Sequence, residues 1–183
     1  MEEQKTSYSL KEKETKKSTA RKYLAEFVYG ATDGTVTTFA IIAGSMGALL
    51  SAKIILILGF ANLLADGFSM ATSNFLSSKS KIELGDGDGK RPIKTATATF
   101  LSFVIVGFIP LLSFVIAPLH SSINDSKFLI SIILTSLAFL VIGGIKGMIT
   151  GKKIVLSAIE SFLIGSLAAL IAFIVGYLLR NLG

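Results

Sequence analysis

The sequence predicts an all-α integral membrane protein built from five membrane-spanning helices. Its 183 residues are 51% hydrophobic and only 16% charged, and their mean hydropathy is +0.70. Soluble domains of similar size carry about 25% charged residues. The long apolar runs lack the alternating polar and apolar pattern of membrane-spanning strands, so helices are expected to be the spanning elements.

Five segments are long enough to cross ~30 Å of hydrocarbon at ~1.5 Å per residue. We expect them at about 24–50, 54–78, 95–119, 128–145 and 154–179. Asp33, Asp66 and Glu160 interrupt the first, second and fifth segments. Pro110 predicts a kink in the third, which could serve as a gating hinge or be only a bend.

The distribution of lysine and arginine predicts the orientation. Of these 18 residues, 15 lie in the tail and in the 79–94 and 146–153 loops, which five spans place on one side of the membrane. The other side holds Lys53, Lys127 and Arg180. The N-terminus is therefore expected in the cytosol and the C-terminus outside. Residues 1–22 would form a polar cytosolic tail, either a solvated extension or an anionic-lipid anchor, and residues 23–183 the transmembrane domain.

Several function classes are disfavoured by composition. The chain has no cysteine and one histidine, His120, which excludes disulfides and thiolate zinc sites. The net charge of +6 lies mainly in the polar segments, so we attribute it to topology and not to nucleic-acid binding. We find no catalytic motif, and the GxGD pattern of intramembrane aspartyl proteases is absent, so we expect neither an enzyme nor a resident cofactor. Asp86 and Asp88 faintly resemble a calcium loop that lacks its closing glutamate, and a flexible turn is expected there.

The two intramembrane aspartates are the main functional signal. A charged side chain at the bilayer centre costs at least ~2.5 kcal/mol, so Asp33 and Asp66 are expected to have a role. On the second span, Asn62, Asp66, Met70 and Asn74 recur every fourth residue and form one stripe. Such a stripe must face the interior of a bundle or a water-filled path. Helical rise places Asp33 level with the Met70–Asn74 turn, and Asp66 about one turn deeper.

The residue types suggest a divalent metal. Oxygen ligands alone suit Mg²⁺ or Ca²⁺, whereas the thioether of Met70 favours a softer ion such as Fe²⁺. Carboxylates that take up protons as the metal leaves would give metal/proton exchange.

Other roles remain open at this stage. Met70 could be packing, and Asn62 and Asn74 could be interhelical hydrogen-bond partners. Gly30 and Gly34 allow close helix approach, either in the path or in dimer packing. Glu160 could take part in transport or pair structurally with Lys146, Lys152 or Lys153.

Short motifs resemble the vacuolar iron transporter family, the Ccc/Vit-type Fe²⁺ and Mn²⁺ transporters. They are GATDG at 30–34, SMA at 69–71, FLSSKS at 75–80, GGIKG at 143–147 and ESFLIG at 160–165. The resemblance implies a homodimer whose metal path lies at the interface and is lined by the first two helices of each protomer. It implies export of Fe²⁺ or Mn²⁺ from the cytosol, coupled to protons, with Asp33 and Met70 contacting the metal and Glu26 near the cytosolic entrance.

Two departures from the family pattern are visible. Plant and parasite members have a glutamate on the second span where this chain has Asn62, and here the carboxylate comes one turn later, at Asp66. Those members also carry a cytosolic metal-binding domain between spans two and three, where this chain has a short loop. This short form is expected in a cell membrane, with a vacuolar or other organelle membrane as the alternative. A non-transporting scaffold and a proton or small-ion pathway are the alternative functions.

Overall fold

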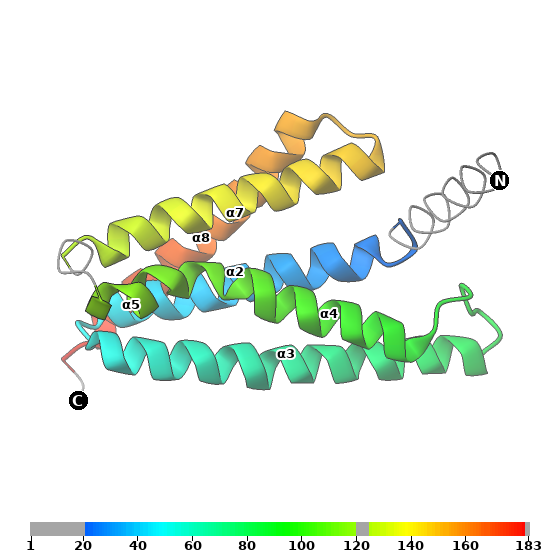
Figure 1. Ribbon diagram of the computed structural model, residues 1–183, viewed down its shortest axis with the longest axis horizontal. Helices are drawn as coiled ribbons and strands as arrows, with labels where there is room; N and C mark the ends of the chain where they lie inside the picture. The colour runs from blue at the N-terminus through cyan, green and yellow to red at the C-terminus, as the bar shows by residue number, and fades with distance from the viewer. Residues whose placement is uncertain (1–20, 120–124, 182–183) are drawn as a thin grey trace, which may run out of the picture.

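The chain folds as a bundle of long helices that alternate in direction along one axis (Figure 1). The computed structural model describes residues 21–119 and 125–181. In order, the helices are α2 (Leu24–Gly47), α3 (Ala52–Glu83), α4 (Pro92–Gly107), η1 (Ile109–Leu111), α5 (Leu112–Ile116), η2 (Ala117–Leu119), α7 (Lys127–Thr150) and α8 (Ile154–Leu179). The described residues contain no strand, which confirms the all-α prediction. His120 and nearly all of the 1–22 tail lie outside these residues.

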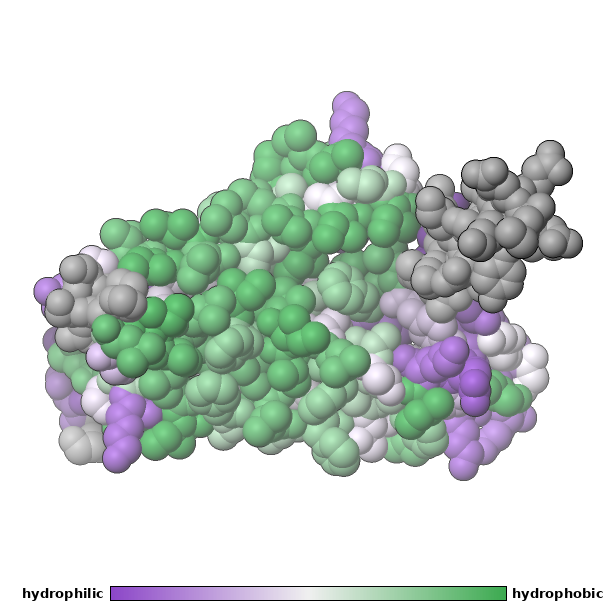
Figure 2. Space-filling view, in the orientation of Figure 1, coloured by the Kyte–Doolittle hydropathy of each residue, from purple (hydrophilic) through white to green (hydrophobic). Residues whose placement is uncertain are grey.

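Within the described residues, four segments are long and apolar enough to cross a membrane: α3, the stretch from Pro92 to Leu119, α7 and α8. Their outward faces carry many large apolar side chains, and Figure 2 shows an apolar band between two more hydrophilic ends of the molecule. The first predicted span, α2, forms the expected helix but is not among these four. Its several threonines, its glycines and two carboxylates lower its hydropathy.

Helix α2 occupies the centre of the bundle, where it contacts α3, α4, α7 and α8. Because neighbouring helices cover much of it, it can carry polar side chains that a lipid-facing helix cannot. A Cβ added at Gly34 would overlap the backbone carbonyl of Phe103 on α4, and one at Gly30 would meet Ser102 on the same helix. The predicted small-residue pair therefore packs α2 against α4 within one chain.

Several helices extend further into the polar connections than predicted. α3 continues to Glu83 instead of 78, α7 continues to Thr150 instead of 145, and α4 begins at Pro92 instead of 95. Serine and lysine end an apolar run, but they do not end a helix. Gly85, with φ of +83°, follows the α3 C-cap and supplies the left-handed residue that stops the helix. By contrast, α8 matches the predicted 154–179 span, and α2 ends three residues early, at Gly47.

The third span is broken at Pro110, as predicted. α4 ends at Gly107, and the chain continues through η1 and the short α5. Proline cannot donate a backbone hydrogen bond, and its ring disturbs the preceding turn. Ser131 on α7 donates a hydrogen bond of 2.7 Å to the Pro110 carbonyl, so the break is tied to a neighbouring helix.

Candidate ion path

Asp33 on α2 and Asp66 on α3 are both half-buried. One helical turn from these aspartates, two consecutive hydrogen bonds link α3 to α2. The Asn62 amide donates to the Thr37 hydroxyl at 3.2 Å, and that hydroxyl donates to the Asp33 carbonyl at 2.8 Å. The two predicted aspartates therefore come together on adjacent helices.

The observed register differs from the predicted one by about one turn. We call the end of the bundle that holds the α3–α4 loop and the α7–α8 turn the basic end, because lysines and arginines gather in these connections. Thr37 on α2 and Asn62 on α3 are in contact and so lie at the same height in the bundle. Asp33 and Asp66 each lie four residues, about one turn, from this contact toward the basic end, so the two aspartates are also at the same height. The prediction of a deeper Asp66 was wrong because it assumed helix ends in one plane. α3 extends about two turns beyond the start of α2.

The other members of the α3 stripe already have protein partners. Met70 is partly buried and packs against the apolar core, which is the packing role left open for it. Asn74 donates a 2.6 Å hydrogen bond to the Thr99 hydroxyl on α4. Both asparagines thus form interhelical hydrogen bonds through their NH₂ groups, and these bonds leave each amide oxygen available as a ligand.

A row of hydroxyl groups on α4 was missed by the sequence analysis. Thr95, Thr99 and Ser102 are buried on the face that meets α2 and α3, and the Thr95 hydroxyl lies 3.1 Å from that of Ser78. Their spacing of four and three residues marks one helix face and could have indicated the row. This row extends the polar environment from the aspartates toward the basic end.

Glu26 lies in the first turn of α2 and is 8% exposed. Its Oε1 accepts a 2.7 Å charge-assisted hydrogen bond from the ammonium group of Lys90, which belongs to the α3–α4 loop. Oε2 is buried and has no hydrogen-bond partner among the described residues. Lys90 entered the prediction of the orientation only as one of the positive charges, and its contact with Glu26 was not predicted.

The loop is also held by its own polar groups. Burial lowers the pKa of the Lys90 ammonium, but the hydrogen bond and charge of Glu26, with those of Asp88, outweigh it and raise the pKa above its ordinary value. The Lys90 backbone N–H donates to Asp88, and this bond, with the Lys90 charge, holds the pKa of the Asp88 carboxyl below its ordinary value. Asp86 is exposed, and Gly85 and Gly89 in the connection between α3 and α4 have positive φ angles.

Glu160 on α8 pairs with Lys146 on α7 at 3.3 Å. The Glu160 side chain is 52% exposed, so the pair is a partly solvated contact between neighbouring helices. This is one of the structural pairings considered for Glu160, and it lies on elements away from the α2–α3 pair of aspartates.

The described residues contain no group of three or more His, Cys, Asp or Glu side chains that could hold a metal ion. The potential ligands nearest to Asp33 and Asp66 along the helices are Thr37 and Asn62, one turn away, and Met70, one turn away on the other side of Asp66. Such a set is weaker than a structural metal site, and weak binding suits an ion that must leave as well as enter.

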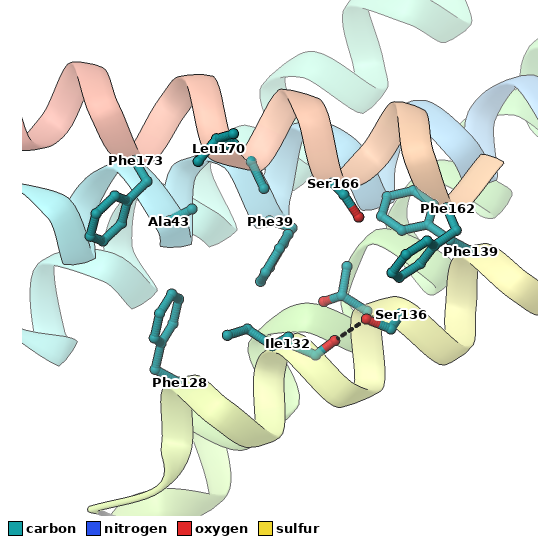
Figure 3. A pocket seen from close by; sticks show the side chains of 12 residues that line it. Phe39, Ala43, Phe128, Ile132, Ser136, Phe139, Phe162, Ser166, Leu170 and Phe173 are labelled. Carbon is teal, nitrogen blue, oxygen red and sulfur yellow. Dashed lines mark hydrogen bonds between the residues drawn. The ribbon is translucent and has the colours of Figure 1, made fainter. Parts of the chain in front are cut away.

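A cavity lies on another side of α2, between α2, α7 and α8 (Figure 3). Its volume is about 250 Å³, and Phe39, Phe128, Phe139, Phe162 and Phe173 point into it. Its lining has no charged residue, and its few hydroxyl groups include that of Ser136, which is bonded to a backbone carbonyl of its own helix. This cavity offers a metal ion no charged ligand.

Comparisons with known proteins show the family to which the chain is similar. The model of the VIT family matches residues 24–91 and 81–177, in two parts that overlap in the α3–α4 loop. The vacuolar iron transporter of Plasmodium berghei is 25% identical, with 87% of this chain and 83% of that protein covered. The vacuolar iron transporter of Centaurea cyanus is 27% identical, covering 85% and 87%, and vacuolar iron transporter 1 of Arabidopsis thaliana is 25% identical, covering 85% of each.

Proposed function

The chain belongs to the VIT family, and from this premise we propose that it exports Fe²⁺ or Mn²⁺ from the cytosol across a membrane in exchange for protons. The observation that carries the proposal is the pairing of the Asp33 and Asp66 carboxylates at one level on α2 and α3. Two negative charges brought together between apolar helices are costly unless a cation or protons compensate them. Relatives named vacuolar iron transporters cover most of the chain and support iron as the first ion to test.

A homodimer would complete the path. One chain offers two carboxylates near each other, which is few for a divalent ion that prefers about six ligands. Helix α3 also exposes Ser69, Thr72 and Ser73 on the outside of the single chain, where lipid cannot satisfy their hydroxyl groups. A second copy packed on this face would cover these hydroxyls and bring its own carboxylates to the same level.

We propose that the ion enters at the basic end. The positive-inside rule places this end in the cytosol, so Glu26 would attract ions at the cytosolic entrance. From there an ion would pass Asn74 and Met70 and reach Asp33 and Asp66, with Asn62 one turn beyond. Protonation of the carboxylates would release the ion on the far side and couple its movement to protons. A cell membrane remains our proposed location, with an organelle membrane as the alternative.

Flux measurements in liposomes test this proposal. Purified protein should move Fe²⁺ or Mn²⁺ when an opposing pH gradient is imposed, and Asp33→Ala should abolish the flux. Asp86→Ala is a matched control, because it removes a carboxylate from the exposed loop and should leave the flux unchanged. Normal flux in Asp33→Ala would remove the central assignment.

Two further outcomes distinguish the alternative functions. If Asp33→Asn unfolds the protein or dissociates the dimer, the aspartates hold helices together and the protein is better described as a scaffold. If protons flow at the same rate with no metal present, the protein is a proton or small-ion pathway. Transport of metal by the intact protein, with a folded but inactive Asp33→Asn dimer, is the result we expect.

A further inference from the structure

The α3–α4 loop closes over the beginning of α2 through contacts made by residues 89–91. Lys22 donates a 2.6 Å hydrogen bond to the Gly89 carbonyl, and the Arg91 backbone N–H donates to the Tyr23 hydroxyl at 3.2 Å. Between them, Lys90 reaches Glu26. Gly89, with φ of +70°, allows the turn that directs the Lys90 side chain inward.

The Lys90–Glu26 pair is more buried than the other ion pairs of the described residues. Its side chains are 18% and 10% exposed, whereas both side chains of the Lys79–Glu83 pair are well exposed. A lysine normally keeps its ammonium group in water, and withdrawing that group is costly unless a carboxylate compensates it. The ammonium group of Lys90, held by the α3–α4 loop, therefore neutralises the Glu26 carboxylate, which could otherwise attract incoming cations.

The second oxygen of Glu26 indicates that the pair is incomplete. Oε2 is buried without a hydrogen-bond partner among the described residues, although a carboxylate can accept several hydrogen bonds. A purely structural ion pair would be expected to satisfy both oxygens in such a buried position. Among the described residues, Oε2 therefore offers an acceptor that a second positive group could use.

We propose that Lys90 is a tethered cation that occupies Glu26 in the resting protein and must be displaced when a divalent metal enters. This inference rests on the proposed transport function, because it assigns Lys90 as a residue that sets metal affinity at the entrance. The lysine competes with the metal for the same carboxylate, and a divalent ion wins through its higher charge. Monovalent ions, which gain less from Glu26, are excluded by the same competition.

Substitution of Lys90 tests the competition. In proteoliposomes, Lys90→Gln should lower the KM for Mn²⁺ by at least about fivefold, the lower end of typical coupling between two ligands of one protein. Lys90→Arg should keep a KM near that of the wild type, because the positive charge remains. Lys79→Gln removes the same charge and a nearby exposed ion pair, and should leave the KM unchanged.

A double substitution separates competition from a general change of surface charge. In a Glu26→Gln background, Lys90→Gln should have no further effect on the KM, because the contested carboxylate is gone. Equal effects of Lys90→Gln in the presence and absence of Glu26 would overturn the proposal. The proposal would also be overturned if Lys90→Gln left the KM unchanged and lowered the melting temperature, because Lys90 would then only stabilise the loop.

A measurement on the unmodified chain remains available if a variant does not fold. Saturating Mn²⁺ should increase acetylation of Lys90 by an amine-reactive reagent several-fold, read by peptide mass spectrometry with Lys79 and Lys81 as internal references. An unchanged rate at Lys90 would overturn the displacement. Release of Lys90 by Mn²⁺ in a protein without flux would refute transport while supporting displacement, whereas flux without release would refute displacement alone.

Discussion

The contact between α2 and α4 at Gly34 gives a quantitative test of the fold. In Gly34→Ala, the new Cβ would overlap the carbonyl oxygen of Phe103 and lie 3.0 Å from its Cα. These are backbone atoms of a buried helix, so no side chain can rotate away. Relief requires that α2 and α4 separate by roughly 0.5–1 Å, and overpacking of this kind typically costs about 1–3 kcal/mol.

The expected loss of stability is large enough to measure. For a protein of this size, 1 kcal/mol corresponds to about 2–4 °C in melting temperature, so Gly34→Ala should melt several degrees lower in detergent. Gly144→Ala is the matched control. Its Cβ would have Ile154 Cγ2 at 3.6 Å as its nearest neighbour, which is an ordinary contact. Since alanine is the better helix former, that variant should be as stable as the wild type or slightly more stable.

The comparison of the two variants also has a functional readout. Asp33 precedes Gly34, so a displaced α2 should move the carboxylate and reduce metal flux even where the protein still folds. The reasoning is refuted if Gly34→Ala and Gly144→Ala have the same melting temperature. That result would mean that α2 and α4 do not approach as closely as described here.

Three further predictions concern polar contacts. Thr99→Val should lower the stability by about 1 kcal/mol, because the Asn74 amide loses its acceptor, and a thermal melt measures it. Ser131→Ala should cost a similar amount by releasing the Pro110 carbonyl, and increased hydrogen exchange around the break in the third span should accompany it. The depressed pKa of Asp88 means that its stabilisation of the loop is complete above the ordinary value of 3.8 and is lost as pH falls through the lower folded value. Amide exchange of the loop below pH ~4 should therefore rise in the wild type, and Asp88→Asn should lack this pH step.

Neighbouring residues supply the controls for the first two of these predictions. Thr97→Val removes an exposed hydroxyl that bonds only within its own helix, and Ser136→Ala does the same on α7. Both should melt close to the wild type. If the interhelical and intrahelical variants lose equal stability, the hydrogen bonds between helices contribute less than proposed.

Hydrophobic length was the most reliable signal in the sequence. The α8 span matches its prediction because Lys152 and Lys153 precede it and Arg180 follows it, so that the end of the apolar run and the end of the helix coincide. At the end of α3 the two differ, since SSKSKIE is polar yet favourable for a helix. The sequence pattern locates the apolar run, and only the capping geometry at Gly85 locates the end of the helix.

Contacts between distant residues were the least predictable part. Lys90 and Glu26 are 64 positions apart, and Asn74 and Thr99 are on helices whose packing the apolar pattern does not determine. Asp33 and Asp66 were predicted to lie on neighbouring helices because a short turn joins α2 to α3. The predicted height of Asp66 relative to Asp33 was wrong by about one turn. One interhelical hydrogen bond, between Asn62 and Thr37, decides that level, and neither residue reveals its partner in the sequence.

The central position of α2 has a consequence for how the protein is made. This helix is synthesised before the other four, yet it is the one whose composition is least suited to lipid by itself. It gains its protein surroundings only after α3, α4 and α8 have been added. We therefore expect stable integration of α2 into the bilayer to depend on the helices that follow it and enclose it.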